Sequence, residues 1–574
     1  MYRYDSIDRQ LIDARVAQHR SQIARNLAGT LSDEELRPLR LQNGLYIERH
    51  GPMLRIAIPY GLLSSAQLRK LADISRRYDR RYGHFTTRLN MQLNWPKFEE
   101  TPEILAELAT VDMHAIQSSG ACIRNITTDK FAGVAPDELT DPRPYCEILR
   151  QWSTLHPEFA FLPRKFKITV NAADEDRALS RMYDLGLQLT RAPGDSGEIG
   201  LRVFAGGGMG RTPFVSQLVR EFLPRRHLLT YLDALLRVYN RHGRRDKLYK
   251  ARIKILVNAL GIEEFTRQVE EEWAFSIDGP ATLTDAEFAR VAAHFAPPPY
   301  ESLPDEEPVL TAAVARDQQD QDRKAFAVWM SRNVHAHRIP GYAAVTLSLK
   351  APGAAPGDVT DTQMDAIADL AERFSFGELR VTHEQNLVLA DVRRRDLPEL
   401  WQEARAHGLA TANIGLLTDI ICCPGGDLCG LAYARSTPVA QAVQRRFGDL
   451  DYLHDLGEIS LNISGCVNSC GHHHVANIGI LGVDKNDEEW YQVTLGGQAG
   501  KDATIGAVIG PSFAAEEVPD VVAALLAVYL EHRRGGERFI DTFRRLGIEP
   551  FKKRAYAGRD RRKSASGEEG AAYA

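Results

Sequence analysis

The chain has 574 residues, of which 44% are apolar and 26% are charged, which suits roughly three or four domain-sized units with large cores. Its 71 Lys and Arg residues nearly balance 76 Asp and Glu residues, for a formal net charge of −5. This balance excludes a nucleic-acid binder held by bulk charge. The chain opens without an apolar signal segment and lacks the ~18-residue apolar stretch of a membrane span. We therefore expect a cytoplasmic protein with no membrane partner and with reduced cysteines.

Local patterns in the first half predict alternating strands and helices. Residues 1–40 are rich in Arg, Asp and Glu and are expected to form an N-terminal arm. Apolar residues alternate with smaller or polar ones from Met53, which predicts a strand. A helix with its cap at Ser64-Ser65 follows, with apolar residues at helical spacing as far as Tyr78. A second strand is predicted to begin near Phe85.

The same order of elements returns in the second half. Residues alternate from Val345, a helix follows Asp361-Thr362, and a strand starts at Leu379. The segment 87–92 lies opposite 382–387, an offset of 382−87 = 295 residues. This pattern favours two duplicated halves with a cleft between them over a solenoid of short repeats.

Four of the seven cysteines form two close pairs, Cys423 with Cys429 and Cys466 with Cys470. Thiolates grouped in this way in a reducing compartment indicate a metal centre. Zinc fits poorly, because five residues separate the first pair whereas zinc knuckles use two to four. An iron–sulfur cubane is wider, and a Pro-Gly-Gly turn at 424–426 allows backbone N–H groups to approach its sulfides. The other three thiols, Cys122, Cys146 and Cys422, are expected to be buried or incidental.

The two cysteine pairs resemble the cluster signature of the sirohaem-dependent sulfite and nitrite reductases, and above all their assimilatory sulfite reductase haemoproteins. The resemblance runs from about residue 40 to residue 550. It implies an α+β fold of pseudo-twofold halves, each with a ferredoxin-like half-domain and a larger mixed α/β domain, with sirohaem and cluster in the cleft. It also implies one [4Fe–4S] cluster held by Cys423, Cys429, Cys466 and Cys470. Cys470 would in addition be the axial ligand of the sirohaem iron.

The resemblance also divides the chain. The implied parts are an arm at 1–40, a first ferredoxin-like half-domain at 41–110, a first sirohaem-binding α/β domain at 111–296, a linker at 297–325, a second ferredoxin-like half-domain at 326–395, a cluster- and sirohaem-binding α/β domain at 396–552, and a polar tail at 553–574. Prolines between 297 and 308 mark the linker.

Three further segments, 84–88, 120–125 and 162–167, resemble family motifs in the family's order. By this resemblance Arg88, Arg124, Lys165 and Lys167 line the distal face of the sirohaem. The residues agree with this role, since a strand over 164–169 would project both lysines to one face. Arginine forks suit oxyanions, and lysines near other cations can have a depressed pKa and deliver protons. The chain departs from the family at Leu89 and Val467, where Gln and Pro are common.

Three more elements are expected to bind the cofactor. Gly206-Gly207-Gly208 follows an apolar run and predicts a loop that cradles an anionic group with backbone N–H donors. It is not a dinucleotide fingerprint, because Arg211 stands where the third glycine is needed. By the resemblance, this loop lies against sirohaem. We also assign Asn468 and Lys254 to sirohaem, although a solvated helix face over 252–254 is an equally open alternative. His472–His474 are expected to have a surface or pocket-lining role.

The implied activity is the six-electron reduction of sulfite to sulfide. The alternative is nitrite reduction to ammonia on the same cofactors. Members specialised for nitrite tend to have Asn in place of Lys167, so Lys165-Phe166-Lys167 favours sulfite. A non-enzymatic alternative is a structural protein whose four paired cysteines hold zinc. No flavin or nicotinamide domain is evident, so electrons must come from a separate NADPH-dependent flavoprotein or ferredoxin, with the 1–40 arm as the expected docking element.

Overall fold

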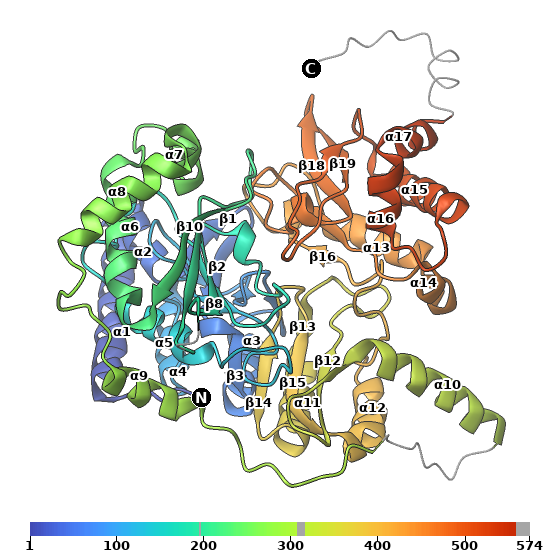
Figure 1. Ribbon diagram of the computed structural model, residues 1–574, viewed down its shortest axis with the longest axis horizontal. Coiled ribbons are helices and arrows are strands. Elements are labelled where there is room, and N and C mark those ends of the chain that lie inside the picture. The colour runs from blue at the N-terminus through green and yellow to red at the C-terminus, as the bar shows by residue number, and fades with distance from the viewer. Residues whose placement is uncertain (195–196, 307–315, 558–574) are drawn as a thin grey trace. The chain divides into compact units, whose positions relative to one another are not determined.

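The computed structural model describes residues 1–194, 197–306 and 316–557 (Figure 1). The chain divides into two compact units. Unit 1 consists of Met1–Ile414 and Ala499–Ala503, and unit 2 consists of Gly415–Gln498 and the chain from Thr504. Among the described helices, none combines the length and the apolar character needed to cross a membrane. The expected polar tail lies outside the described residues from residue 558 onward.

Two five-stranded sheets of unit 1 exchange strands between the halves of the repeat. Their orders are β1-β2-β5-β4-β13 and β11-β12-β15-β14-β3. The strands are β1 (Leu45–Glu48), β2 (Gly51–Ile56), β3 (Leu62–Ser64), β4 (Tyr82–Phe85), β5 (Met91–Leu93), β11 (Val334–Ala336), β12 (Tyr342–Leu347), β13 (Asp358–Thr360), β14 (Glu378–Val381) and β15 (Leu387–Arg393). Thus β3 of the first half pairs with β14, and β13 of the second half pairs with β4.

The two halves repeat with an offset of 296 residues. Ser64 caps α3 (Ser65–Tyr78) and Thr360 caps α11 (Asp361–Phe374), each within a capping box, and 360−64 = 296. The sequence-based offset of 295 is therefore wrong by one residue. That offset aligned Thr87 with Thr382. The hydrogen-bonded turn of the first half begins at Thr86, which is therefore the counterpart of Thr382. In strands a shift of one residue moves every side chain to the other face.

One hydrophobic core joins both half-domains within unit 1. The segment expected to be an arm folds as α1 (Ser6–Leu27) and α2 (Asp33–Gln42) and contributes Val16, Ile23 and Leu36 to this core. The remaining helices around it are α4 (Thr101–Ala109), α10 (Arg316–Asn333) and α12 (Leu397–Ala406). Helix α10 thus begins inside the expected linker.

Each half also carries a second sheet, and the two have the same topology. In unit 1 the order is β10-β9-β8-β7-β6, and in unit 2 it is β16-β17-β18-β19-β20. The first three strands in sequence are parallel and the last two antiparallel in both sheets. The strands are β6 (Thr127–Thr128), β7 (Ile168–Asn171), β8 (Leu185–Arg191), β9 (Ile199–Ala205), β10 (Gln217–Pro224), β16 (Ile421–Cys422), β17 (Leu461–Ser464), β18 (Ile478–Lys485), β19 (Glu488–Leu495) and β20 (Ala507–Val508).

Helices complete the cores of these two sheets. Those of unit 1 are α5 (Arg143–Ser153), α6 (Leu228–His242), α7 (Ile253–Leu260), α8 (Ile262–Ala274) and α9 (Asp285–Ala292). Those of unit 2 are α13 (Thr437–Arg446), α14 (Leu450–Leu456), α15 (Val518–His532), α16 (Phe539–Leu546) and α17 (Glu549–Ala555).

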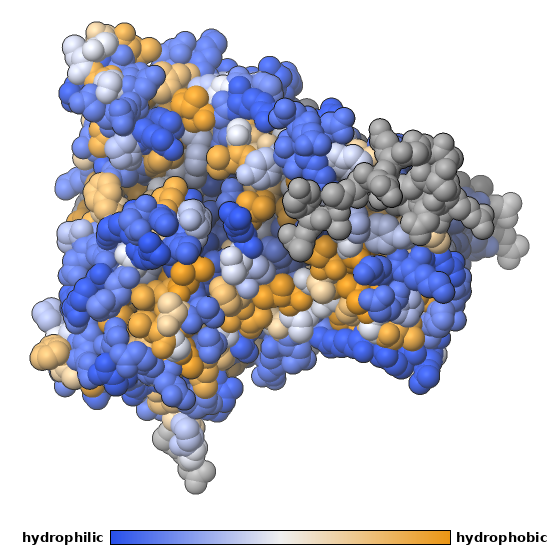
Figure 2. All heavy atoms as spheres, turned by 90° about the horizontal axis from the view of Figure 1, so that it is seen from above, coloured by the Kyte–Doolittle hydropathy of each residue, from blue (hydrophilic) through white to orange (hydrophobic). Residues whose placement is uncertain are grey.

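The face in Figure 2 is largely hydrophilic, with hydrophobic residues showing between the charged ones.

Candidate functional site

The cysteine pairs follow two neighbouring parallel strands of unit 2. Cys423 directly follows β16, and Cys466 follows β17 after one glycine. In the register of the two strands Cys422 lies opposite Ile463. Because the carboxyl ends of parallel strands meet at one edge of a sheet, both loops start from the same place. The topology thus brings together pairs that are 37 residues apart in the sequence.

The charges of the four paired thiols influence one another's pKa values. Burial, together with the nearby Cys470 and Cys466, raises the pKa of Cys423 to about 11. Burial also raises the pKa of Cys466 to about 11, with contributions from Cys470 and Cys429. All seven cysteines are unbridged. Within the described part of the chain, no three His, Cys, Asp or Glu side chains are arranged to hold a single metal ion.

Backbone N–H groups point at these sulfurs. The amide of Gly465 donates to Sγ of Cys423 over 3.2 Å, and N–H groups of Asn468 donate to the thiol of Cys466. A side chain at position 465 would clash, since its Cβ would lie 2.5 Å from the carbonyl oxygen of Ala434. Sulfur ligands surrounded by amide donors suit an iron–sulfur cluster, whose sulfurs accept such bonds.

Buried polar groups without partners lie on both sides of Cys470 in the sequence. The Ser469 hydroxyl and both ring nitrogens of His473 are buried and make no hydrogen bond to the described residues. Burial lowers the pKa of His473 well below its usual range, so the ring is neutral. Of the surface or pocket-lining role expected for the three histidines, the surface alternative is wrong for His472 and His473, which are 3% and 0% exposed, and the pocket-lining alternative stays a prediction. Unpartnered polar groups of this kind fit a polar cofactor better than an apolar core.

The other cysteines lie elsewhere. Cys146 in α5 and Cys422 at the end of β16 are buried. Cys122 is partly exposed, and its thiol donates to the carbonyl oxygen of Ser119 over 3.2 Å.

The predicted basic residues of unit 1 come from three segments that meet. A parallel bridge joins Ile123 to Phe166, and the amide of Arg124 donates to the carbonyl oxygen of Phe166 over 2.7 Å. Phe166 is fully buried, while Lys165 and Lys167 on either side of it are partly exposed. The alternation predicted for the two lysines is therefore present. The predicted strand over 164–169 is not, since regular pairing begins only at Ile168.

Tyr183 joins Arg88 to Lys167. The guanidinium carbon of Arg88 lies 4.3 Å, and Nζ of Lys167 lies 5.4 Å, from the centroid of this buried ring. Arg88 also donates to Oγ1 of Thr127 over 2.8 Å and to the carbonyl oxygen of Asn125 over 2.6 Å. The turn of 86–90 thus fixes its arginine against the segment that carries Arg124.

The lysine at 167 has a perturbed ionisation. Burial, with the charges of Lys165 and Arg252 and then of Arg88, lowers the pKa of Lys167 well below its usual range. Burial likewise lowers the pKa of Arg88, although an arginine stays charged. A lysine that exchanges its proton more readily than usual, beside permanently charged arginines, can bind an anion and protonate it.

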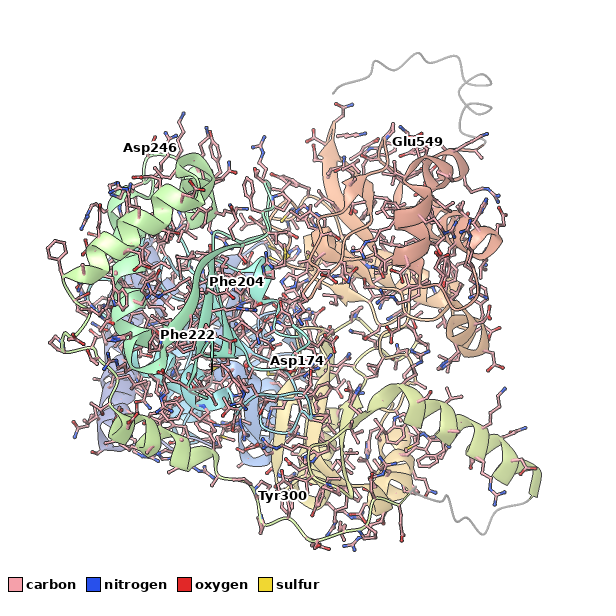
Figure 3. All side chains as sticks on the ribbon, viewed as in Figure 1. Asp174, Phe204, Phe222, Asp246, Tyr300 and Glu549 are labelled. Carbon is pink, nitrogen blue, oxygen red and sulfur yellow. The ribbon has the colours of Figure 1, made fainter. Side chains whose placement is uncertain are left out.

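The glycine loop is held by the third basic segment. Nζ of Lys254 donates to the carbonyl oxygens of Met209 over 2.8 Å and of Thr212. A Cβ at Gly208 would lie 3.0 Å from Arg252 and 3.1 Å from Lys254. The loop follows β9, whose Phe204 is labelled in Figure 3. Lys254 is only 5% exposed, so the alternative of a solvated helix face is wrong.

Gly206 and Gly207 have packing reasons of their own. A Cβ at Gly206 would lie 2.8 Å from Val257, and one at Gly207 would lie 2.4 Å from the carbonyl oxygen of Tyr183. These two glycines thus permit close packing, and only Gly208 faces the basic side chains Arg252 and Lys254.

Two residues near this site escaped the sequence analysis. Asp184 is fully buried, binds Arg252 through two bonds of 2.7 and 2.8 Å, and accepts the amide of Lys167 over 3.0 Å. Tyr46 on β1 accepts a bond from Arg55 over 3.2 Å. A lone acidic or aromatic residue carries no local signal of function, so only the three-dimensional contacts reveal these two. Leu89, the departure beside Arg88, is buried in the core of the half-domains.

Comparison with known proteins places this chain in a family. Residues 119–277 and 416–560 match the nitrite and sulphite reductase 4Fe-4S domain, and residues 46–111 and 337–407 match the nitrite/sulfite reductase ferredoxin-like half domain. Sulfite reductase [ferredoxin] 1 of Mycolicibacterium paratuberculosis is 29% identical over 501 residues, covering 85% of this chain and 81% of the relative. Ferredoxin–nitrite reductase of Synechococcus elongatus is 29% identical over 489 residues, covering 83% and 85%.

A solved structure supports the same conclusion. The NirA protein of Mycobacterium tuberculosis has a TM-score of 0.74 and 27% identity, and the match covers 91% of this chain and 92% of that one. The predicted α+β fold with repeated ferredoxin-like half-domains is confirmed. The chain belongs to the nitrite and sulphite reductase family, whose members use sirohaem and a [4Fe–4S] cluster.

Proposed function

We propose that this protein reduces sulfite to sulfide with electrons from a ferredoxin. The observation that carries the proposal is the meeting of Arg88, Arg124 and the lysines at 165 and 167 in unit 1, from three separate segments. A small oxyanion needs fixed positive charge, and this group supplies it in a chain whose formal net charge is −5. Relatives named as sulfite reductases of the ferredoxin type support the choice of substrate and donor.

The four paired cysteines would hold the cluster, and Cys470 would also bind the sirohaem iron. The amides of Gly465 and Asn468 then stabilise thiolate charge, which the raised pKa values of Cys423 and Cys466 otherwise oppose. When bound, the two cofactors supply single electrons and an iron that takes the substrate sulfur. Gly208 would face the sirohaem carboxylates, and Lys254 would hold its loop from behind.

The chain's own side chains would then manage charge and protons. Arg88 and Arg124 orient the oxyanion by their planar forks, because hydrogen bonds to Asn125, Thr127 and Ser118 fix both guanidinium groups. Lys167, with its depressed pKa, donates a proton to a departing oxygen and is recharged from solvent. Lys165 adds a second ammonium donor on the same face as Lys167, opposite the buried Phe166.

Nitrite is the second candidate substrate. It is favoured by the relative from Synechococcus elongatus, which is as similar as the sulfite reductase and is named a nitrite reductase. Steady-state turnover of sulfite and of nitrite with a chemical reductant tests the choice. A much higher kcat/KM for sulfite is expected, and a much higher value for nitrite would overturn the sulfite assignment.

The electron donor needs its own test. Reduced ferredoxin should support turnover, and NADPH with a flavoprotein reductase should support little. The opposite ranking would overturn the donor assignment. Turnover with the chemical reductant is the control that the enzyme is active, and the substrate assignment would stay intact.

A further inference from the structure

Tyr46 stands among several cations, two of which, Arg124 and Lys165, belong to the proposed anion site. Arg55 from β2 donates to its hydroxyl over 3.2 Å and lies 4.9 Å from the centroid of its ring. The positive charges of Arg124 and Lys165 both lower the pKa of the phenol. Arg40 in α2 and Arg164, beside Lys165, are also within electrostatic reach. The tyrosine is thus surrounded by positive charge from several separate elements.

The position of this phenol is fixed. Nε and Nη2 of Arg55 donate to Oε1 of Gln92 over 3.0 and 2.6 Å, and Nη1 lies 3.4 Å from the carbonyl oxygen of Ser118. That same carbonyl accepts from Arg124 over 3.0 Å. One carbonyl therefore links the arginine that holds Tyr46 to an arginine of the anion site. The Ser119 hydroxyl also lies beside the phenol.

We propose that Tyr46 is a further residue of the anion site, whose hydroxyl sets how strongly Arg124 and Lys165 attract the substrate. Tyr46 acts through these two residues and is a positioning residue. As a neutral phenol it leaves the positive charge of the site intact. As a phenolate it neutralises part of that charge and competes with the substrate for the same cations. The inference rests on the proposed function, since it presupposes an anionic substrate at this place.

The electrostatics put this change within an accessible pH range. Burial alone raises the pKa of Tyr46, but Arg55, Arg124 and Lys165 outweigh it and lower the pKa to about 8. An ordinary tyrosine ionises near ~10. The site should therefore lose part of its affinity for anions just above neutrality, where neither arginine changes its charge.

Nitrite affinity of the holoenzyme tests the inference, measured by the change of visible absorption from about pH 6 to about pH 10. Nitrite keeps one charge over this range, so the probe itself does not titrate. In the wild type the Kd should rise about tenfold across pH 8. In Tyr46→Phe the step at pH 8 should disappear while affinity at lower pH is kept. Any fall in affinity that follows proton loss from Lys167 should be the same in the wild type and the variant. Tyr78→Phe, which alters a tyrosine in α3 whose hydroxyl donates to Glu107 over 2.9 Å, is the matched control and should keep the wild-type profile.

A second variant separates ionisation from mere packing. Arg55→Gln removes the nearest charge but keeps the phenol, so the step in Kd should move to higher pH. Parallel profiles in the wild type and Tyr46→Phe, a uniform loss of affinity at every pH, or an unmoved step in Arg55→Gln would each overturn the inference. If the wild type binds and reduces neither sulfite nor nitrite at any pH, the proposed function fails instead.

Discussion

The carbonyl oxygen of Thr87 lies 3.0 Å from Nδ1 of His383, the residue that takes the place of Thr87 in the second half. The two turns of the repeat, 86–90 and 382–386, therefore meet face to face. Each turn closes on itself, with Thr86 bonded to Asn90 over 2.8 Å and Thr382 bonded to Asn386 over 3.0 Å. Their positive φ angles, 56° at Leu89 and 62° at Gln385, occupy equivalent positions.

The equivalence shows how the halves have diverged. Position 88 is an arginine directed at Tyr183, whereas its counterpart Glu384 forms an ion pair with Lys130 over 2.9 Å. Burial would raise the pKa of Glu384, but Lys130 holds it down to about 2, so the carboxylate is ionised. One turn presents a cation and the other an anion already neutralised within the protein. This difference favours the first turn over the second for the proposed binding of an anionic substrate.

Replacing Arg88 by lysine should therefore be far from conservative. The lysine keeps the charge but loses the planar fork that contacts Thr127 and Asn125. We expect kcat/KM for sulfite to fall about 10²–10³-fold with a chemical reductant, as for loss of one fixed donor. Arg202→Lys, on the exposed face of β9, is the control and should retain full activity. Equal, small losses in both variants would contradict the role of Arg88.

The charged form of Lys167 should destabilise the folded protein, although function depends on this lysine. Its pKa is depressed, so the folded protein binds its proton less tightly than the unfolded chain does. This penalty is fully present below the folded pKa and disappears as the pH rises past the unfolded value of about 10. Lys167→Met should therefore raise the free energy of unfolding by about 0.5–2 kcal/mol at neutral pH while reducing turnover severely. Urea unfolding at pH 7 and in mild alkali checks this, with the exposed Lys97→Met as the control. A Lys167→Met variant less stable than the wild type would contradict the prediction.

Specificity gives a separate test at the same position. Lys167→Asn removes a proton donor and one positive charge, which sulfite needs more than the singly charged nitrite does. We expect kcat/KM for sulfite to fall about tenfold more than that for nitrite. Steady-state assays of both substrates with one chemical reductant measure the ratio, and equal losses would count against a role in specificity.

Asp184 should be the structural anchor of the basic group. It neutralises Arg252 and holds the amide of Lys167, and it is fully buried. Asp184→Asn leaves Arg252 without its counter-ion, and such a loss costs about 3–5 kcal/mol for a buried pair. Thermal unfolding of the apoprotein should show this loss. Asp174→Asn, at the exposed residue labelled in Figure 3, should unfold like the wild type. A stable Asp184→Asn protein with an intact anion site would disprove the anchoring role.

Local sequence patterns predicted the repeat, but they could not predict contacts between segments that are distant in the sequence. Periodicity and a capping residue located α3 and α11, because both signals lie within one helix. The exchange of β3 and β13 between sheets left no such signal, since a three-residue strand does not specify its partner. The same limit explains the wrong offset, which depended on a short alignment of two threonines.

The candidate site divides in the same way. Residues in distinctive motifs, such as the cysteine pairs and Lys165-Phe166-Lys167, could be chosen from the sequence. The environment of Lys254 could not, because three loop carbonyls from 208–212 surround its ammonium group only after folding. Burial of His473 was equally invisible, since a run of histidines has the composition of a surface segment.

The cysteine assignment has the sharpest consequence at Cys470, the most exposed of the four paired thiols. If Cys470 holds the cluster and also the sirohaem iron, Cys470→Ser should lose both cofactors together. Iron, acid-labile sulfide and the visible bands of the purified protein should then fall in parallel, to about a tenth or less of the wild-type content. Cys146→Ser, at a buried thiol in α5, is the matched control and should keep both cofactors even if it lowers stability. A Cys470→Ser protein that keeps its full sirohaem spectrum would show that another group binds the iron, because a serine hydroxyl is a poor ligand for it.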